Sequence, residues 1–134
     1  MKFNELLGEK FEKLVKEDKE IIAVVIFGSF VTNREYSRDV DVCLILDKSY
    51  SNSYMTTKRL KFLSVMSGQF DITIFQQLPL YIKQRVLKDG KVILSKNDDV
   101  LYDIAYAMIK DYNLFEKIYL NYLNSVGEFV EVVK

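Results

Sequence analysis

Two aspartates one residue apart are the first candidates for chemistry in this sequence. Asp39 and Asp41 begin an apolar run, so on a strand both side chains face one way while Val40 and Val42 point into a core. Two carboxylates side by side repel, and each raises the proton affinity of the other unless a cation lies between them. The simplest reason for this arrangement is a divalent metal. Ligand sets made only of oxygen favour Mg²⁺ or Mn²⁺ over zinc.

A Gly-Ser pair stands before the aspartates, and nine residues separate Ser29 from Asp39. The β-branched and aromatic run Ile22–Phe27 predicts a strand buried on both faces, and Gly28 follows it directly. A glycine there lets the backbone turn sharply and approach a ligand. Free N–H groups and the Ser29 hydroxyl would suit an anion. Alone, the pair is better explained as a plain connection; the aspartates that follow favour a site.

Together these pieces resemble the signature of the nucleotidyltransferase superfamily related to DNA polymerase beta. The short length resembles its minimal, MNT-type branch, which is often paired with helical HEPN-domain proteins. The resemblance runs from about Glu20 to the end of the C-terminal helix. It implies a third carboxylate on a later strand, for which the alternating segment Phe70–Phe75 offers Asp71. Asp71 either completes a metal site and takes a proton from an attacking hydroxyl, or faces solvent at a strand edge.

Two positions depart from the family pattern. The family commonly has Arg-Gly shortly after Gly-Ser, and a serine before the first aspartate. This chain has Thr32-Asn33 and Arg38 there. Arg34 or Arg38 could compensate phosphate charge instead, or both could be solvated surface arginines.

Composition restricts the remaining possibilities. With 134 residues, 49% of them hydrophobic and 28% charged, we expect one domain over residues 1–134. Nineteen basic and nineteen acidic residues cancel, which disfavours nucleic-acid or membrane binding through a broad basic surface. The absence of histidine leaves carboxylate chemistry, and Cys43 is the only cysteine, so we expect a semi-buried side chain there. Without a signal peptide or long apolar run, a cytoplasmic protein is predicted.

The periodicities predict an α+β fold. We expect a small mixed β-sheet of about four strands with helices covering one face. The expected helices span residues 4–16, 54–67, 79–88 and 98–126, and the expected strands 22–27, 39–46, 70–75 and 91–94. Leu60 is expected in the core, Gly90 in a left-handed C-terminal position, and Asp98 or Asp99 as the cap of the last helix.

The last helix carries a heptad seam. Its members are Leu101, Ala105, Met108, Tyr112, Phe115, Tyr119, Tyr122 and Val126. A second apolar stripe lies beside it, and a helix this long reaches roughly 40 Å, beyond the ~30 Å of a small domain. We expect most of this surface in the core, with an excess that could hold a second copy of the chain or a helical partner.

The resemblance implies transfer of AMP from ATP to a hydroxyl of a protein acceptor, as by the antitoxin of a HEPN/MNT toxin-antitoxin pair. Gly28 and Ser29 would hold the β- and γ-phosphates, Asp39 and Asp41 would bind Mg²⁺, and Asp71 would help hold a second ion and activate the acceptor. One alternative is a catalytically silent module that neutralises or scaffolds a helical partner by contact alone. Another is a structural α+β domain in which the spacing is chance.

Overall fold

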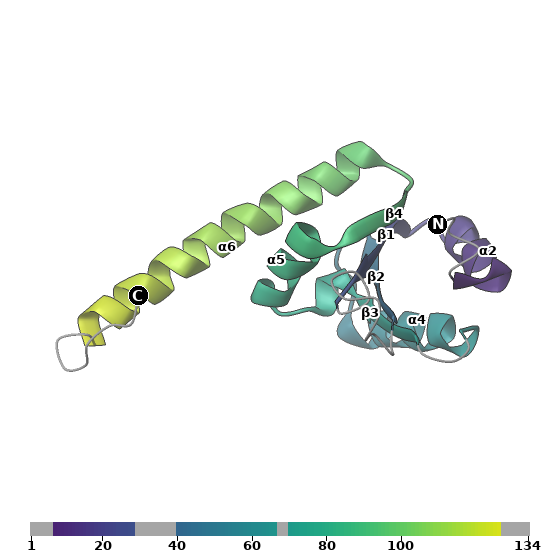
Figure 1. Cartoon of the computed structure of the whole chain (residues 1–134), viewed down its shortest axis with the longest axis horizontal. Coiled ribbons are helices and arrows are strands. Elements are labelled where there is room, and N and C mark those ends of the chain that lie inside the picture. The colour runs from purple at the N-terminus through teal and green to yellow at the C-terminus, as the bar shows by residue number, and fades with distance from the viewer. Residues whose placement is uncertain (1–6, 29–39, 67–69, 127–134) are drawn as a thin grey trace.

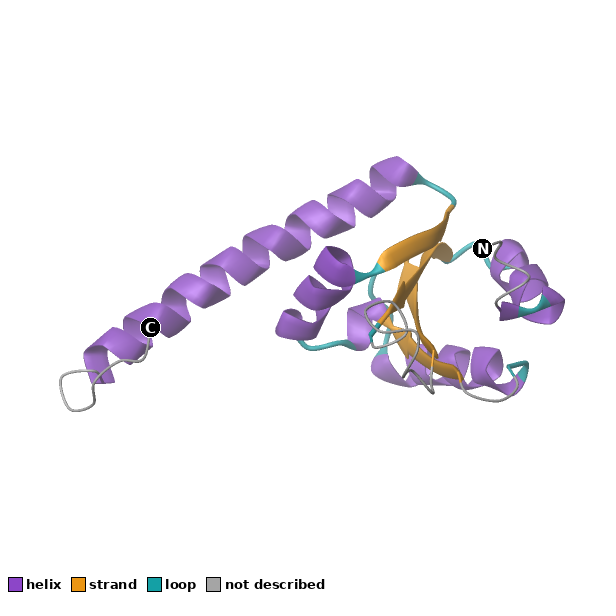
Figure 2. Ribbon diagram, in the orientation of Figure 1, coloured by secondary structure: helices purple, strands orange, loops and turns teal. Residues whose placement is uncertain are grey.

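The computed structural model describes residues 7–28, 40–66 and 70–126 (Figures 1 and 2). Helices and strands are interspersed along these ranges. In chain order they are α2 (Glu9–Glu17), β1 (Ile21–Phe27), β2 (Val40–Leu46), α4 (Asn52–Ser64), β3 (Phe70–Ile74), the 3₁₀ turn η1 (Phe75–Gln77), α5 (Leu80–Asp89), β4 (Lys91–Ser95) and α6 (Asp98–Val126). Asn4, the predicted start of the first helix, lies outside these ranges; the described helix begins after Gly8.

The described strands form one four-stranded mixed sheet in the order β3-β2-β1-β4. β1 pairs antiparallel with both β2 and β4, and β2 pairs parallel with β3. The predicted fold class, α+β with a small mixed sheet and a long C-terminal helix, is confirmed. β3 ends one residue earlier than predicted, because Phe75 already begins η1.

Apolar side chains form a separate core on each face of the sheet. The α2/α4 core contains Leu7, Phe11, Val15, Ile21, Val24, Val42, Leu44, Leu46, Met55, Phe62, Ile72 and Ile74. The α5/α6 core contains Ile22, Ala23, Val25, Cys43, Ile45, Phe75, Val86, Leu101 and Met108. The prediction that helices cover one face is therefore wrong. β1 and β2 are apolar on both sides, and each side must be removed from water.

Helix α4 buries a different face from the predicted one. Leu60 is 53% exposed, whereas Phe62 is fully buried and meets the ring of Phe11 edge to face at 5.6 Å. Met55 and Phe62 are seven residues apart and share a face at 3.6 residues per turn, and Leu60 falls outside that face. Leu60 is therefore exposed to solvent although it is apolar.

Gly90 ends α5 for a reason other than the predicted one. Its φ is −74°, so it is not left-handed. A Cβ at this position would lie 2.3 Å from the carbonyl oxygen of Val86 and 2.5 Å from Cγ1 of Val25. Glycine is needed because the end of α5 packs directly on β1.

The cap of α6 is Asn97, where Asp98 or Asp99 was predicted. Oδ1 of Asn97 accepts a hydrogen bond from the backbone N–H of Val100 at 3.1 Å. Asp98 is one residue further along and accepts from the Ser95 hydroxyl at 2.5 Å. Both aspartates thus lie in the first turn, where negative charge complements the helix dipole.

Only the first half of α6 packs on the domain. Leu101 and Met108 are buried in the α5/α6 core, and Tyr112 is partly buried against it. The C-terminal half of the helix projects away from the sheet (Figure 1). The exposed apolar set there, called the α6 free surface below, is Leu114, Phe115, Ile118, Tyr119 and Leu120, each between 49% and 59% exposed. The expectation that most of the apolar surface lies in the core is corrected. None of the described helices is long and apolar enough to cross a membrane.

The contrast within α4 gives a stability prediction. Phe62→Ala should lower the free energy of unfolding by about 3–5 kcal/mol, because it leaves a cavity beside Phe11. Leu60→Ala, on the exposed side of the same helix, should change it by less than about 0.5 kcal/mol. Urea unfolding followed by circular dichroism measures both. Equal effects of the two substitutions would contradict the packing described here.

Candidate active site

The pairing of β1 with β2 places Asp41 at the end of β1. Phe27 is opposite Asp41 in the antiparallel register, so the carboxylate-bearing residue lies beside Gly28. Val42, the next residue, is fully buried in the α2/α4 core, and Asp41 points to the opposite face, the one covered by α5 and α6. Asp41 is half-buried, at the open end of the sheet. The predicted alternation of Asp41 and Val42 is confirmed.

Gly28 accommodates the Asp41 carboxylate by having no side chain. Its φ is +85°, a conformation that residues with a Cβ rarely adopt. A Cβ there would lie 2.2 Å from Oδ2 of Asp41 and 3.1 Å from its Cγ. The predicted sharp turn at Gly28 is confirmed, and there the backbone approaches the Asp41 carboxylate, which a larger residue would displace.

Asp71 lies beside Asp41 on the neighbouring strand. The two residues are direct partners in the parallel β2–β3 register, so their side chains leave the same face of the sheet. Neighbouring strands are about 4.8 Å apart, which places the carboxylates within reach of a shared cation. Asp71 is exposed, with 53% of its side-chain surface accessible. Ser29 and Asp39, the other two predicted site residues, lie outside the described residues, as do Arg34 and Arg38.

The structure adds Arg59, a neighbour of Asp71 that the sequence did not single out. Its Nε–H donates to the backbone carbonyl of Ile72 at 2.5 Å, and Nη2 lies 3.4 Å from Oδ1 of Asp71. Arg59 belongs to the basic run Lys58, Arg59 and Lys61 in α4, which could equally well have been solvated. Nothing in its spacing from Asp71 marks the pair, because the contact depends on how α4 packs beside β3.

Lys58 has a structural role at the other end of the sheet. Its ammonium group contacts Asp18 at 2.5 Å and Glu20 at 2.8 Å. Burial of Lys58 opposes its charge, but these hydrogen bonds outweigh it and raise the pKa of Lys58. The pKa of Glu20 is correspondingly lowered, first by Lys58 and then by the Tyr54 hydroxyl. Lys58 therefore ties α4 to the start of β1 and contributes nothing to the site.

Cys43 is not available as a nucleophile. Its side chain is fully buried in the α5/α6 core. Burial raises the pKa of the thiol to about 12, with a small opposing effect from the Thr73 hydroxyl. A thiolate is therefore absent near neutral pH. Among the described residues, the remaining candidates for chemistry at this site are the carboxylates of Asp41 and Asp71.

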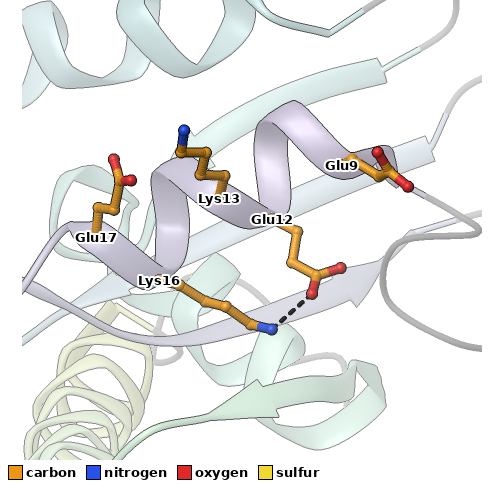
Figure 3. A pocket seen from close by; sticks show the side chains of 5 residues that line it. All are labelled: Glu9, Glu12, Lys13, Lys16 and Glu17. Carbon is orange, nitrogen blue, oxygen red and sulfur yellow. Dashed lines mark hydrogen bonds and ion pairs between the residues drawn. The ribbon is translucent and has the colours of Figure 1, made fainter.

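The charged hollow on α2 is not part of this site. Five side chains of that one helix line it, and Lys16 bridges Glu12 at 2.6 Å across it (Figure 3). Pairs of opposite charge four residues apart are ordinary on exposed helix surfaces. The hollow lacks the convergence of different elements seen at Gly28, Asp41 and Asp71.

The donor set fits a divalent cation that prefers oxygen. Asp41 and Asp71 supply carboxylates from adjacent strands, and Gly28 leaves room for one of them where a Cβ would intrude. Within the described ranges no group of three or more acidic, cysteine or histidine side chains comes together, so the described part of the site is a carboxylate pair. Mg²⁺ is commonly bound by one or two carboxylates when substrate phosphates complete its coordination, and a pair is within that range.

The fold is that of a nucleotidyltransferase. The chain belongs to the family described as polymerase beta nucleotidyltransferases, which matches residues 9–99. A Methanocaldococcus jannaschii protein named as a protein adenylyltransferase is 35% identical over 115 residues, covering 83% of this chain and 86% of the relative.

Two solved complexes contain chains with the same fold. One is a toxin-antitoxin with AMP-PNP, for which the TM-score is 0.66 and the identity 18%, covering 87% of this chain and 95% of the other. The other is the tri-AMPylated Shewanella oneidensis HEPN toxin with its MNT antitoxin, with a TM-score of 0.63, 17% identity, and coverage of 87% and 92%. At these identities the likeness establishes the architecture, which agrees with the predicted family.

The contact between Gly28 and Asp41 gives a second prediction. Gly28→Ala should cost more stability than Gly8→Ala, although both glycines have positive φ, because only at Gly28 would the new Cβ meet another atom. Backbone strain alone accounts for about 1–3 kcal/mol at either position. Chemical denaturation of both variants measures the difference.

A double-mutant cycle isolates the carboxylate. In an Asp41→Ala background, Gly28→Ala should become less costly by at least about 1 kcal/mol, since the atoms that it would strike are gone. An unchanged cost in that background would show that strain at Gly28, and not the close approach of Asp41, requires the glycine.

Proposed function

We propose that the chain is a metal-dependent nucleotidyltransferase that transfers AMP from ATP to a hydroxyl of a protein acceptor. The observation that carries this proposal is the packing of the Asp41 carboxylate against Gly28, in register with Asp71. Two carboxylates on one face, beside a glycine turn, suit a reaction whose main requirement is to position and neutralise a triphosphate.

Each site residue has a proposed role. Gly28 and Ser29 hold the β- and γ-phosphates, with backbone N–H groups of the turn as donors. Asp39 and Asp41 bind Mg²⁺, or Mn²⁺ in its place, and Asp71 helps to hold a second ion. When bound, these ions would neutralise charge on the triphosphate and the departing pyrophosphate. In this proposal Asp71 also accepts the proton of the attacking acceptor hydroxyl.

The relatives support a protein acceptor. The Methanocaldococcus relative carries the name of a protein adenylyltransferase, and in the Shewanella complex the HEPN toxin is tri-AMPylated. ATP is the corresponding donor, in agreement with AMP-PNP in the other complex. We infer that this chain acts as the antitoxin of a HEPN/MNT pair in the cytoplasm, where ATP is available.

The α6 free surface is the proposed docking site for a HEPN-type helical partner. Apolar side chains that are about half exposed along one helix are unusual unless another surface covers them. Since β4 ends at Ser95 and α6 then turns back over the sheet, α6 runs in the direction of β1 (Figure 1). A partner bound there would lie toward the end of the sheet that carries Gly28 and Asp41.

We also propose that residues 1–134 form a single minimal nucleotidyltransferase domain. The α5/α6 core joins side chains from β1, β2, η1, α5 and α6, so the long helix shares its buried half with the sheet. A helix anchored in this way is part of the domain that it extends.

The nucleotide site is tested by thermal unfolding with ATP and Mg²⁺. A ligand that binds only the folded state adds about 2.7 kcal/mol at a hundredfold excess over Kd. The wild type should gain stability only when both are present. Asp41→Asn should lose that gain and abolish transfer while its melting temperature without ligand stays close to that of the wild type.

Asp103→Asn is the matched control. It removes an exposed carboxylate on α6, far along the chain from the site, and should keep the full ligand-induced shift. If the wild type shows no shift with ATP and Mg²⁺, the enzyme proposal fails. The alternative, a silent module that neutralises its partner by contact alone, then takes its place.

The docking surface is tested by co-expression with a HEPN-domain protein of the same organism. The double substitution Leu114→Glu and Ile118→Glu should abolish co-purification, because two charges would be buried on binding. The ATP-dependent thermal shift of the same variant should be unchanged. Analytical sedimentation of the wild type without a partner tests the competing possibility that a second copy of the chain covers this surface. If the wild type is a dimer and the double variant is a monomer, the second copy is the partner.

A further inference from the structure

Arg59 binds the edge of the sheet next to the third carboxylate. Its Nε–H is fixed on the carbonyl oxygen of Ile72 at 2.5 Å, and Nη2 lies 3.4 Å from Oδ1 of Asp71. The guanidinium group is planar, so the first contact fixes the direction of the second. Of the two oxygens of Asp71, Oδ1 is therefore the one that faces Arg59.

The arginine reaches Asp71 from the opposite side of the sheet. Helix α4 contributes Met55 and Phe62 to the α2/α4 core, whereas Asp71 is in register with Asp41 on the face of α5 and α6. β3 is an edge strand, so the long side chain of Arg59 can pass around it. The contact with Ile72 would be enough for an arginine that only covered the strand edge, so the contact with Asp71 is additional.

Charge explains why a cation belongs there. Asp41 and Asp71 are adjacent carboxylates and repel each other in the absence of a metal ion. Resting on the proposed function, in which Asp71 holds the second ion, we propose that Arg59 is a tethered cation that competes with that metal ion for Asp71. Arg59 neutralises the carboxylate before the metal arrives, and its positive charge opposes the metal when it does.

Two effects of Arg59 on metal binding have opposite signs, and their sizes decide between them. The ion pair orients Asp71, which would favour binding, but with 34% and 53% of the two side chains exposed it is weak. Repulsion between a guanidinium and a divalent ion involves twice the charge product of an ordinary ion pair and acts over several ångströms. Repulsion is therefore the larger effect, and removal of Arg59 should tighten metal binding.

The consequence is that the second ion would load mainly together with the nucleotide. A bound triphosphate supplies negative charge that offsets Arg59. Without nucleotide, the positive charge of Arg59 keeps the affinity at Asp71 low. Arg59 thus acts as a positioning residue through Asp71 and sets the metal concentration that the site requires.

The experiment is a Mn²⁺ titration of the full chain, first without nucleotide and then with AMP-PNP, in which free Mn²⁺ is followed by electron paramagnetic resonance. Arg59→Gln should tighten the weaker Mn²⁺ site about tenfold. Arg59→Met, which keeps the aliphatic stem, should do the same if Arg59→Gln folds poorly. Arg59→Lys keeps the charge and should remain close to the wild type. Lys61→Gln removes an exposed charge from the same helix and is the matched control, with no change expected.

The tightening should disappear in an Asp71→Asn background, since the two residues act on one site. Unchanged or weaker Mn²⁺ binding by both Arg59→Gln and Arg59→Met would overturn the proposal and leave Arg59 as a cap of the β3 edge. A complete absence of AMP-PNP-dependent Mn²⁺ binding in the wild type would be a different result. It would overturn the nucleotidyltransferase proposal itself, and the role of Arg59 with it.

Discussion

The register between β1 and β2 is the constraint on which both the core and the site depend. With Phe27 opposite Asp41, Val42 enters the α2/α4 core and Asp41 lies against Gly28 at the open end of the sheet. A slip of one residue would turn every β2 side chain to the other face. Asp41 would then point into an apolar core, where an unpaired charge is very costly. The other residues of β2 are apolar on both faces, so the charge of Asp41 itself is what disfavours the slipped register.

The central strand makes this platform rigid because both of its faces are covered. β1 has buried neighbours in the two cores, and the end of α5 approaches it so closely that Gly90 has no room for a Cβ. The edge strand β3 is anchored in a different way. It is tied to α4 by the Arg59 contact with Ile72, and the same arginine faces Asp71. A site whose reaction depends on position benefits from having one carboxylate on a central strand and another beside an anchored edge.

The sequence determined the parts of this arrangement that are local in the chain. A period of two residues predicts the alternation of Asp41 and Val42 and the third strand. Turn chemistry predicts the sharp turn at Gly28. Contacts between elements were not predictable in this way. The phase of α4, which buries Phe62 and exposes Leu60, depends on tertiary packing. Arg59 and Asp71 meet only because α4 lies beside β3, and a run of basic residues carries no signal of that.

The long helix α6 is buried against the domain over its first half and exposed over its second half. Its heptad pattern continues without change, yet only the part up to Tyr112 has a sheet to cover it. A helix that were merely structural would gain nothing from apolar residues beyond that point, since exposed apolar surface promotes aggregation. The described chain does not cover the α6 free surface from its own core, which is why we propose this surface as a docking site. Because α6 turns back after β4, it runs in the direction of β1, toward the end of the sheet that bears Gly28 and Asp41 (Figure 1). Binding of a partner and presentation of its hydroxyl group would then be two results of one contact, since a bound acceptor has a high effective concentration at the site.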